Sequence, residues 1–139
     1  MIEPLTCFIL DTGHCLASEH HLITGGERRQ LACHALVALL RHPQQGWFLW
    51  DAGYAPALLT ATRRFPFVLY RLATPLRLQP ELAVAAQLPR FGLTPADIGT
   101  VVVSHFHADH VAGLRDFSTA RFIALAEAYQ AVASLTGLA

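Results

Sequence analysis

The chain has 139 residues and a mass of 15.2 kDa, the size of one domain, so two independent hydrophobic cores are not expected. Its ten basic residues balance ten acidic ones, and this formal charge of zero excludes the basic surface of a general nucleic-acid-binding protein. Every basic residue is an Arg, which excludes P-loop phosphate binding, Schiff-base chemistry and a Ser-Lys dyad in this chain, because each needs an amine.

The first half of the sequence predicts three strands. The first covers residues 5–10 and ends in a turn at 11–13, where small and polar residues follow the apolar run. A polar loop is expected over 17–30. Residues 31–50 predict a hairpin of two buried strands, because a turn signal at 43–46 separates an almost continuous apolar run from the aromatic residues at 47–50.

The second half predicts helices first and strands afterwards. Five prolines divide the region 56–91 into short helical pieces, of which 80–91 is expected to be a helix that stops at Gly92. β-branched and apolar runs predict strands at 100–103 and 121–125, and an Ala-rich stretch predicts a final helix over 127–135. Strands that alternate with helices on a mostly buried sheet indicate the α/β class.

Composition also bears on location and partners. A hydrophobic fraction of 53% is high for a free-standing domain of this length, so part of the surface is expected to need a partner. The apolar runs are too short or too interrupted to cross a bilayer, and the first four residues do not resemble a secretory signal. We therefore expect a cytoplasmic protein without membrane contact. Cys7, Cys15 and Cys33 lack C-x-x-C spacing and are interpreted as reduced thiols.

The most informative segment is a buried Val-rich strand followed by His-x-His-x-Asp-His. If the strand continues through the motif, His105 and His107 lie on the same side and present two imidazoles to one ion. Asp109 and His110 then fall on a loop or first helical turn, at a second metal position. Neutral imidazoles with a carboxylate suit zinc, and iron or manganese are alternatives where oxygen ligands are added.

In this motif the sequence resembles the metallo-β-lactamase-fold hydrolase superfamily. The segments 10–13, 48–53 and 111–114 are similar to the family's first strand end, its strand ending in Asp-x-Gly and the helix start after the motif. The resemblance implies that His105 and His107 bind one metal, and that Asp109 and His110 bind the second. It also implies that Asp51 orients the ligands, although a carboxylate that only caps the strand end is the alternative.

The resemblance implies a further expectation about completeness. The family has a four-layer αββα sandwich with ligands from both halves, namely a third His, a bridging Asp and a final His downstream of the motif. No His follows His110 here. We therefore expect residues 1–139 to form a single incomplete domain, the N-terminal half of the sandwich with a mixed sheet and flanking helices. Its uncovered sheet would then associate with itself or with a partner chain.

Several other residues are given ordinary structural interpretations. His20 and His21 are expected to be solvated in a polar loop. The Arg and aromatic residues of 63–72 fit an amphipathic helix, with a substrate entrance or a binding site for an anionic group as the alternatives. Asp11-Thr12-Gly13 is not interpreted as an aspartic-protease motif, because a second copy is missing.

The resulting functional hypothesis is a metal-dependent hydrolase of small-molecule esters, lactones or thioesters. Two zinc-type ions would activate a water molecule, and Asp109 would accept its proton and redeliver it to the leaving group. This chain alone is expected to be inactive if the further ligands are missing. The alternatives are a non-catalytic metal-binding half-domain that acts through a partner, and an iron-dependent redox relative of the same fold.

Overall fold

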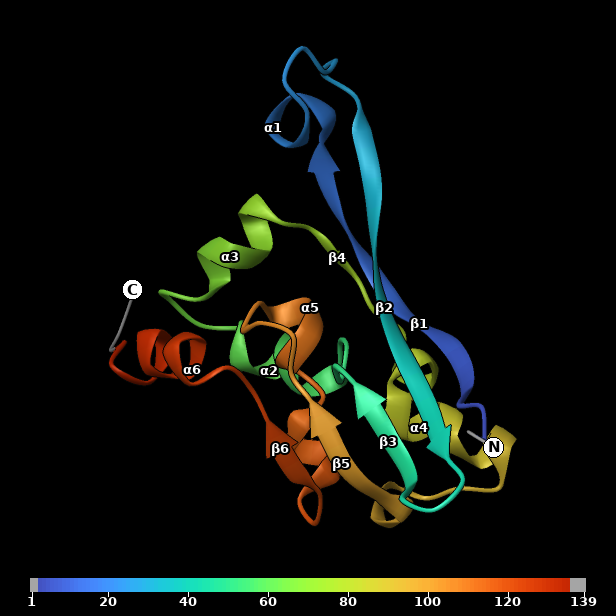
Figure 1. The fold of residues 1–139 in the computed structure, drawn as a ribbon. Helices are drawn as coiled ribbons and strands as arrows, with labels where there is room; N and C mark the ends of the chain where they lie inside the picture. The colour runs from blue at the N-terminus through green and yellow to red at the C-terminus, as the bar shows by residue number, and fades with distance from the viewer. Residues whose placement is uncertain (1–2, 136–139) are drawn as a thin grey trace.

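A six-stranded sheet organises the fold of the computed structural model, which describes residues 3–135 (Figure 1). The strand order is β4-β1-β2-β3-β5-β6; the first four of these strands pair antiparallel, whereas β3, β5 and β6 run parallel. The mixed sheet with its helices confirms the predicted α/β class. The strands are β1 (Thr6–Ser18), β2 (Gln30–His42), β3 (Gly46–Trp50), β4 (Leu76–Arg77), β5 (Ile98–Val102) and β6 (Arg121–Ile123).

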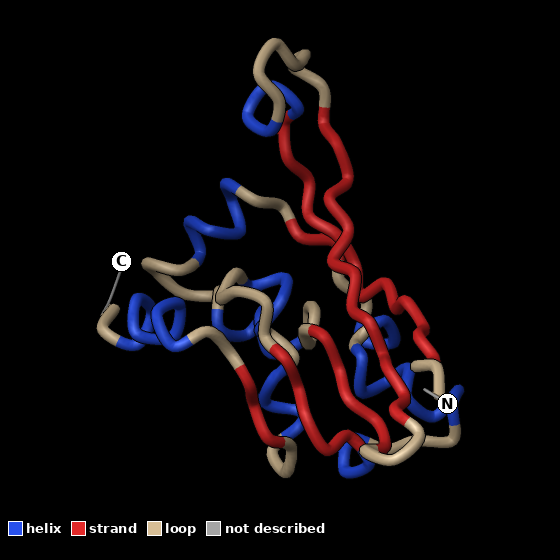
Figure 2. The backbone as a smooth tube through the Cα atoms, in the orientation of Figure 1, coloured by secondary structure: helices blue, strands red, loops and turns tan. Residues whose placement is uncertain are grey.

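Short helices separated by loops connect several of the strands, as the prolines of the region 56–91 predict (Figure 2). None of the described helices is long and apolar enough to span a membrane. The α-helices are α1 (Glu19–Leu22), α2 (Pro56–Ala61), α3 (Val68–Ala73), α4 (Val84–Gln87), α5 (Ala108–Val111) and α6 (Ala126–Ala133). The 3₁₀ helices are η1 (Pro80–Leu82), η2 (Leu88–Phe91), η3 (Pro95–Asp97) and η4 (Leu114–Phe117).

The hairpin expected over 31–50 is confirmed by β2 and β3, but the first strand is longer than predicted. β1 does not turn at 11–13; it continues to Ser18, and its pairing with β2 shifts register between Asp11 and His14. Gly13 lies within this register shift and has a φ of 110°, a backbone conformation that glycine adopts readily. The predicted loop at 17–30 is correspondingly shorter, because α1 and both strand ends occupy part of it. β1 and β2 together project as a long arm that carries α1 (Figure 1).

The continuous helix predicted over 80–91 is wrong, because η1, α4 and η2 divide this segment. Ala83, with a ψ of 142°, interrupts the helical backbone between η1 and α4. The buried Gln87 amide donates to the backbone oxygens of Leu82 at 2.6 Å and Asp11 at 2.9 Å, which fixes α4 against β1. The predicted stop is confirmed, since Gly92 ends η2 with a left-handed φ of 71°.

One face of the sheet carries the hydrophobic core. Inward-facing residues from four adjacent strands are at most 3% exposed. They pack with residues of α4, η2 and η4, so the helical segments that follow β4 and β5 cover this face. Burial on this scale is the main stabilising contribution to the fold. The strand residues of the core are Leu10, Val37, Leu39, Leu49, Ile98 and Val101.

The opposite face of the sheet is apolar and exposed. A row of directly paired positions crosses five strands, from Ile9 through Ala38, Trp50 and Val102 to Ile123. The side chains at its ends and centre, Ile9, Ile123 and Trp50, are 63%, 43% and 50% exposed. Because alternate residues of a strand point to opposite faces, this open face follows from the same pattern that builds the core.

The loop after β3 is locked to β1 through Thr12. The buried Thr12 hydroxyl donates to the Ala35 backbone oxygen at 2.9 Å and accepts from the Tyr54 amide at 3.0 Å. Gly53, with a φ of 65°, lies so close that a Cβ added there would collide with the Thr12 side chain. Gly53 therefore combines a left-handed backbone with a close approach, and both require glycine.

We predict that Gly53→Ala lowers the free energy of unfolding by about 3 kcal/mol, because it adds a steric clash to left-handed strain. Gly46→Ala is the matched control, since Gly46 has a similar φ of 77° and open space around an added Cβ. We expect that control to lose only about 1 kcal/mol. Urea unfolding followed by circular dichroism measures both variants, and equal losses would contradict the role of Thr12.

Candidate metal centre

The candidate metal centre lies where the parallel strands β3 and β5 end side by side. The Asp51 amide donates to the Val102 oxygen at 2.7 Å, and the Ala52 amide donates to the His110 oxygen at 2.8 Å. The Gly113 amide then donates to the Gly53 oxygen at 3.1 Å. The loop after β3 is thus hydrogen-bonded to the segment that carries the His-x-His-x-Asp-His motif.

The histidines of the motif come together, although not for the reason that the sequence suggested. β5 ends at Val102, so His105 and His107 lie in the loop before α5 and not on a continued strand. Their ring centroids are nevertheless 4.7 Å apart, and those of His105 and His110 are 3.9 Å apart. The turn of the loop into α5, rather than strand alternation, brings the three imidazoles together.

Asp109 and His110 lie in α5, immediately after this loop, as the sequence predicted. The Asp109 Oδ2 atom is 3.1 Å from Nε2 of His110, and the Asp109 side chain remains 36% exposed. A carboxylate with this access can reach either a metal ion or a substrate beside the motif.

Asp51 is more than the cap of a strand end. Its side chain is nearly fully buried, and its Oδ1 accepts from the Ser104 amide at 2.8 Å. Its Oδ2 accepts from the Ser104 hydroxyl and lies next to Nδ1 of His110, both at 2.7 Å. Because a carboxylate only accepts, the imidazole proton of this contact lies on Nδ1, and Nε2 of His110 is the nitrogen that faces Asp109.

Ser104 is a positioning residue that the sequence analysis missed. Its hydroxyl has one proton, which it donates to Asp51, so it accepts from Nδ1 of His105 at a distance of 3.0 Å. The lone pair of His105 therefore lies on Nε2. The available sequence signal was a polar residue between a Val-rich strand and the motif, and that signal alone does not assign a role.

The donor set fits zinc in its chemistry. Neutral imidazoles that present Nε2, with one carboxylate beside them, are the groups that zinc prefers. Within residues 3–135, however, no three His, Cys, Asp or Glu side chains are arranged as a group that could hold a metal ion. The histidines and acids are gathered, but the part of the chain that the structure describes does not form a closed ligand set.

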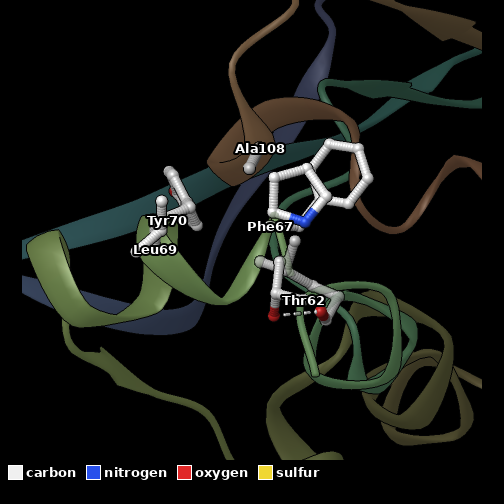
Figure 3. A pocket seen from close by; sticks show the side chains of 7 residues that line it. Thr62, Phe67, Leu69, Tyr70 and Ala108 are labelled. Atoms are coloured by element: carbon white, nitrogen blue, oxygen red, sulfur yellow. Dashed lines mark hydrogen bonds between the residues drawn. The ribbon is translucent and has the colours of Figure 1, made fainter. Parts of the chain in front are cut away.

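An apolar cavity of about 360 Å³ lies next to the motif (Figure 3). α3 contributes Leu69 and Tyr70 to its wall, and α5 contributes Ala108. Ala108 directly follows His107 in the motif. Aromatic residues of the 63–72 segment thus face a cavity, which favours the substrate-entrance alternative over a purely structural helix. The remaining lining residues are Leu58, Thr62, Pro66 and Phe67.

Two phenols near the motif keep their protons at neutral pH. Burial raises the pKa of Tyr54 far above its ordinary value, and neighbouring Tyr70, Cys15 and Asp109 raise it further. Burial also raises the pKa of Tyr70. Both side chains therefore remain neutral hydrogen-bond donors, and that of Tyr70 lines the cavity. The sequence analysis did not single out Tyr54, because a lone Tyr after the turn at 51–53 has no distinguishing spacing.

The expected solvated histidines lie away from this centre. His20 and His21 are in α1 at the end of the β1–β2 arm, and both are exposed. The Ser18 hydroxyl is 2.7 Å from Nδ1 of His20.

The comparisons with known proteins agree with this fold. A sequence model of the metallo-beta-lactamase superfamily matches residues 31–138, and the chain belongs to that superfamily. It is 29% identical, over 84% of its length, to N-acyl homoserine lactonase AiiB of Agrobacterium fabrum strain C58. The resemblance based on the motif is thereby confirmed. This alignment covers 45% of AiiB, so the chain spans about half the length of the curated relatives it matches.

Solved structures show the same fold at low sequence identity. An N-acyl homoserine lactone hydrolase with the product N-hexanoyl-L-homoserine at its catalytic metal centre has a TM-score of 0.78 and 20% identity. The match covers 93% of this chain and 52% of that one. AidC, a dizinc quorum-quenching lactonase, has a TM-score of 0.64 and 15% identity, with 98% of this chain and 47% of that chain covered.

The hydrogen bonds of Asp51 predict a graded response to substitution. We expect Asp51→Ala to lower the free energy of unfolding by about 3 kcal/mol, because bonds to a buried carboxylate are lost. We expect Asp51→Asn to lose about half as much, since its amide oxygen still accepts from the Ser104 amide and Asn tolerates the φ of 66°. Urea denaturation tests this order, and equal losses would contradict it.

Proposed function

We propose that this chain forms the zinc-binding edge of a hydrolase that opens N-acyl homoserine lactones. The observation that carries the proposal is the hydrogen-bond network of Asp51 and Ser104, which engages the Nδ1 atoms of His105 and His110 and leaves Nε2 as the nitrogen of each ring outside this network. Orientation of imidazoles by a carboxylate and a hydroxyl is the usual support of a catalytic metal site. The lactonase relatives and the zinc of AidC support the choice of metal and reaction.

In this proposal His105 and His107 would hold the first zinc ion, and Asp109 and His110 would hold the second. When bound, zinc would supply a hydroxide at neutral pH and polarise an ester carbonyl. The Asp109 carboxylate takes up the proton of the attacking water and returns it to the alcohol oxygen that leaves the lactone ring. Asp51 and Ser104 hold the proton on the Nδ1 atoms, so the ligand atoms keep their orientation throughout.

The cavity beside Ala108 supplies the substrate preference in this proposal. Its walls are largely apolar, and the exposed ring of Phe67 and the neutral phenol of Tyr70 line it. Such a surface accommodates an acyl chain better than a phosphate or a charged peptide. The zero formal charge of the chain agrees with a neutral substrate.

We further propose that ligands from outside this chain complete the site. His105 and His107 give the first ion two protein ligands, whereas catalytic zinc normally takes three. The chain covers about half of its lactonase relatives, and one apolar face of its sheet is exposed. A second half-domain, in a longer chain or a partner, would cover that face and supply the remaining His and Asp ligands. A non-catalytic metal-binding module is the second candidate, favoured by the open ligand set.

We predict that, in a chain extended by the second half, His107→Ala reduces bound zinc at least about tenfold, because one of few imidazole ligands is lost. The matched control is His21→Ala, which removes an exposed imidazole from α1 and should leave zinc unchanged. Equilibrium dialysis against zinc followed by elemental analysis measures both variants. Equal zinc in the two variants would contradict the assignment of His107.

The test of the whole proposal compares two proteins. We expect residues 1–139 with added zinc to show little or no opening of N-hexanoyl homoserine lactone, because the ligand set is incomplete. A chain extended by a second half with His, Asp and His ligands should be active, and His105→Ala should abolish that activity. Mass spectrometry of the ring-opened acid measures both. Turnover by residues 1–139 alone would overturn the proposal that ligands from outside this chain complete the site. An extended chain that binds zinc without turnover would favour the non-catalytic module.

A further inference from the structure

Two cysteines face each other where the β1–β2 arm leaves the body of the protein. Cys15 of β1 is directly opposite Cys33 of β2 in the antiparallel register, and β4 pairs with Cys15 on its other side through Leu76. Both cysteines are free and partly buried. Neither belongs to the candidate metal centre, and the proposed reaction does not use them.

The register places the two thiols within reach of a disulfide. Directly opposed residues of an antiparallel pair have Cα atoms about 4.5 or 5.5 Å apart, depending on the type of pair. Either spacing lies within the range of about 4.4 to 6.8 Å that disulfides span. Opposed side chains also point to the same face of the sheet. The pairing of the two strands therefore brings the thiols to a spacing compatible with a bond between them.

We propose that Cys15 and Cys33 are a redox-modification site, a dithiol that hydrogen peroxide oxidises reversibly to an intramolecular disulfide. One thiolate attacks a peroxide oxygen, which yields a sulfenic acid and, after protonation, water. The second thiolate attacks the sulfenic sulfur, the S–S bond forms, and a second water leaves. The two sulfurs together lose two electrons, and a small dithiol restores both thiols.

The location links this chemistry to the cavity without depending on the proposed function. The Cys15 side chain lies near Tyr54, and Tyr54 lies near Tyr70, which lines the cavity. Oxidation consumes the Cys15 thiol, the member of this group that is farthest along the sequence from the cavity residues. Burial raises the pKa of Cys15, so its thiolate is scarce at neutral pH and the reaction should accelerate as the pH increases.

The third cysteine provides the internal control. Cys7 is exposed and lies opposite Leu40, so it has no cysteine partner across the strands. Trypsin cleaves after Arg29 and Arg41, which places Cys33 in a peptide of its own. Cys7 and Cys15 share the peptide that ends at Arg28. The variant Cys7→Ser therefore makes any disulfide-linked pair of peptides unambiguous.

The experiment treats the Cys7→Ser chain with hydrogen peroxide in the presence of a metal chelator, followed by alkylation, trypsin and mass spectrometry. We expect loss of both free thiols together, a mass decrease of two hydrogens, a linked peptide pair and full recovery with dithiothreitol. The variants Cys7→Ser/Cys15→Ser and Cys7→Ser/Cys33→Ser should instead gain oxygen or form intermolecular dimers. The same products from the Cys7→Ser chain itself would overturn the proposal. Should the double variants fail to fold, the linked peptides of the Cys7→Ser chain decide the question alone.

Discussion

The buried carboxylate of Asp51 is the interaction on which the candidate site depends. Burial of an ionised carboxylate is costly unless hydrogen bonds compensate it, and here the Ser104 amide, the Ser104 hydroxyl and His110 do so. These partners lie 53 and 59 residues away in the sequence. The carboxylate thus joins the ends of two parallel strands and fixes the orientation of the imidazoles beside them.

The sequence identified the donors of this site but not the arrangement that holds them. Spacing in the motif predicted that His105 and His107 approach one another, yet the strand ends at Val102 and the loop makes the approach. The role of Ser104 depends on a side chain that reaches it from another strand. Local periodicity contains no information about such a contact, whereas the family resemblance already pointed to Asp51.

The contrast between local sequence signals and contacts from distant segments also explains which strands and helices were predicted correctly. The hairpin over 31–50 has its turn and apolar runs in one continuous segment, so local signals were sufficient. The first strand was predicted too short, because β2 and β4 pair with both sides of β1 beyond Gly13. Tertiary contacts therefore decided the length of the first strand. The helix over 80–91 was predicted too long, because the backbone of Ala83 leaves the helical conformation between η1 and α4.

The open sheet face and the candidate metal centre lie on the same strands. The exposed row from Ile9 to Ile123 crosses the same strands whose ends carry Asp51 and the motif, so Trp50 directly precedes Asp51. Large exposed apolar patches of this kind commonly mark surfaces of association. Trp50 therefore lies one residue from the carboxylate that holds the motif in place. Under the proposal that a second half-domain completes the site, one structural element would both bury the open face and supply the remaining ligands.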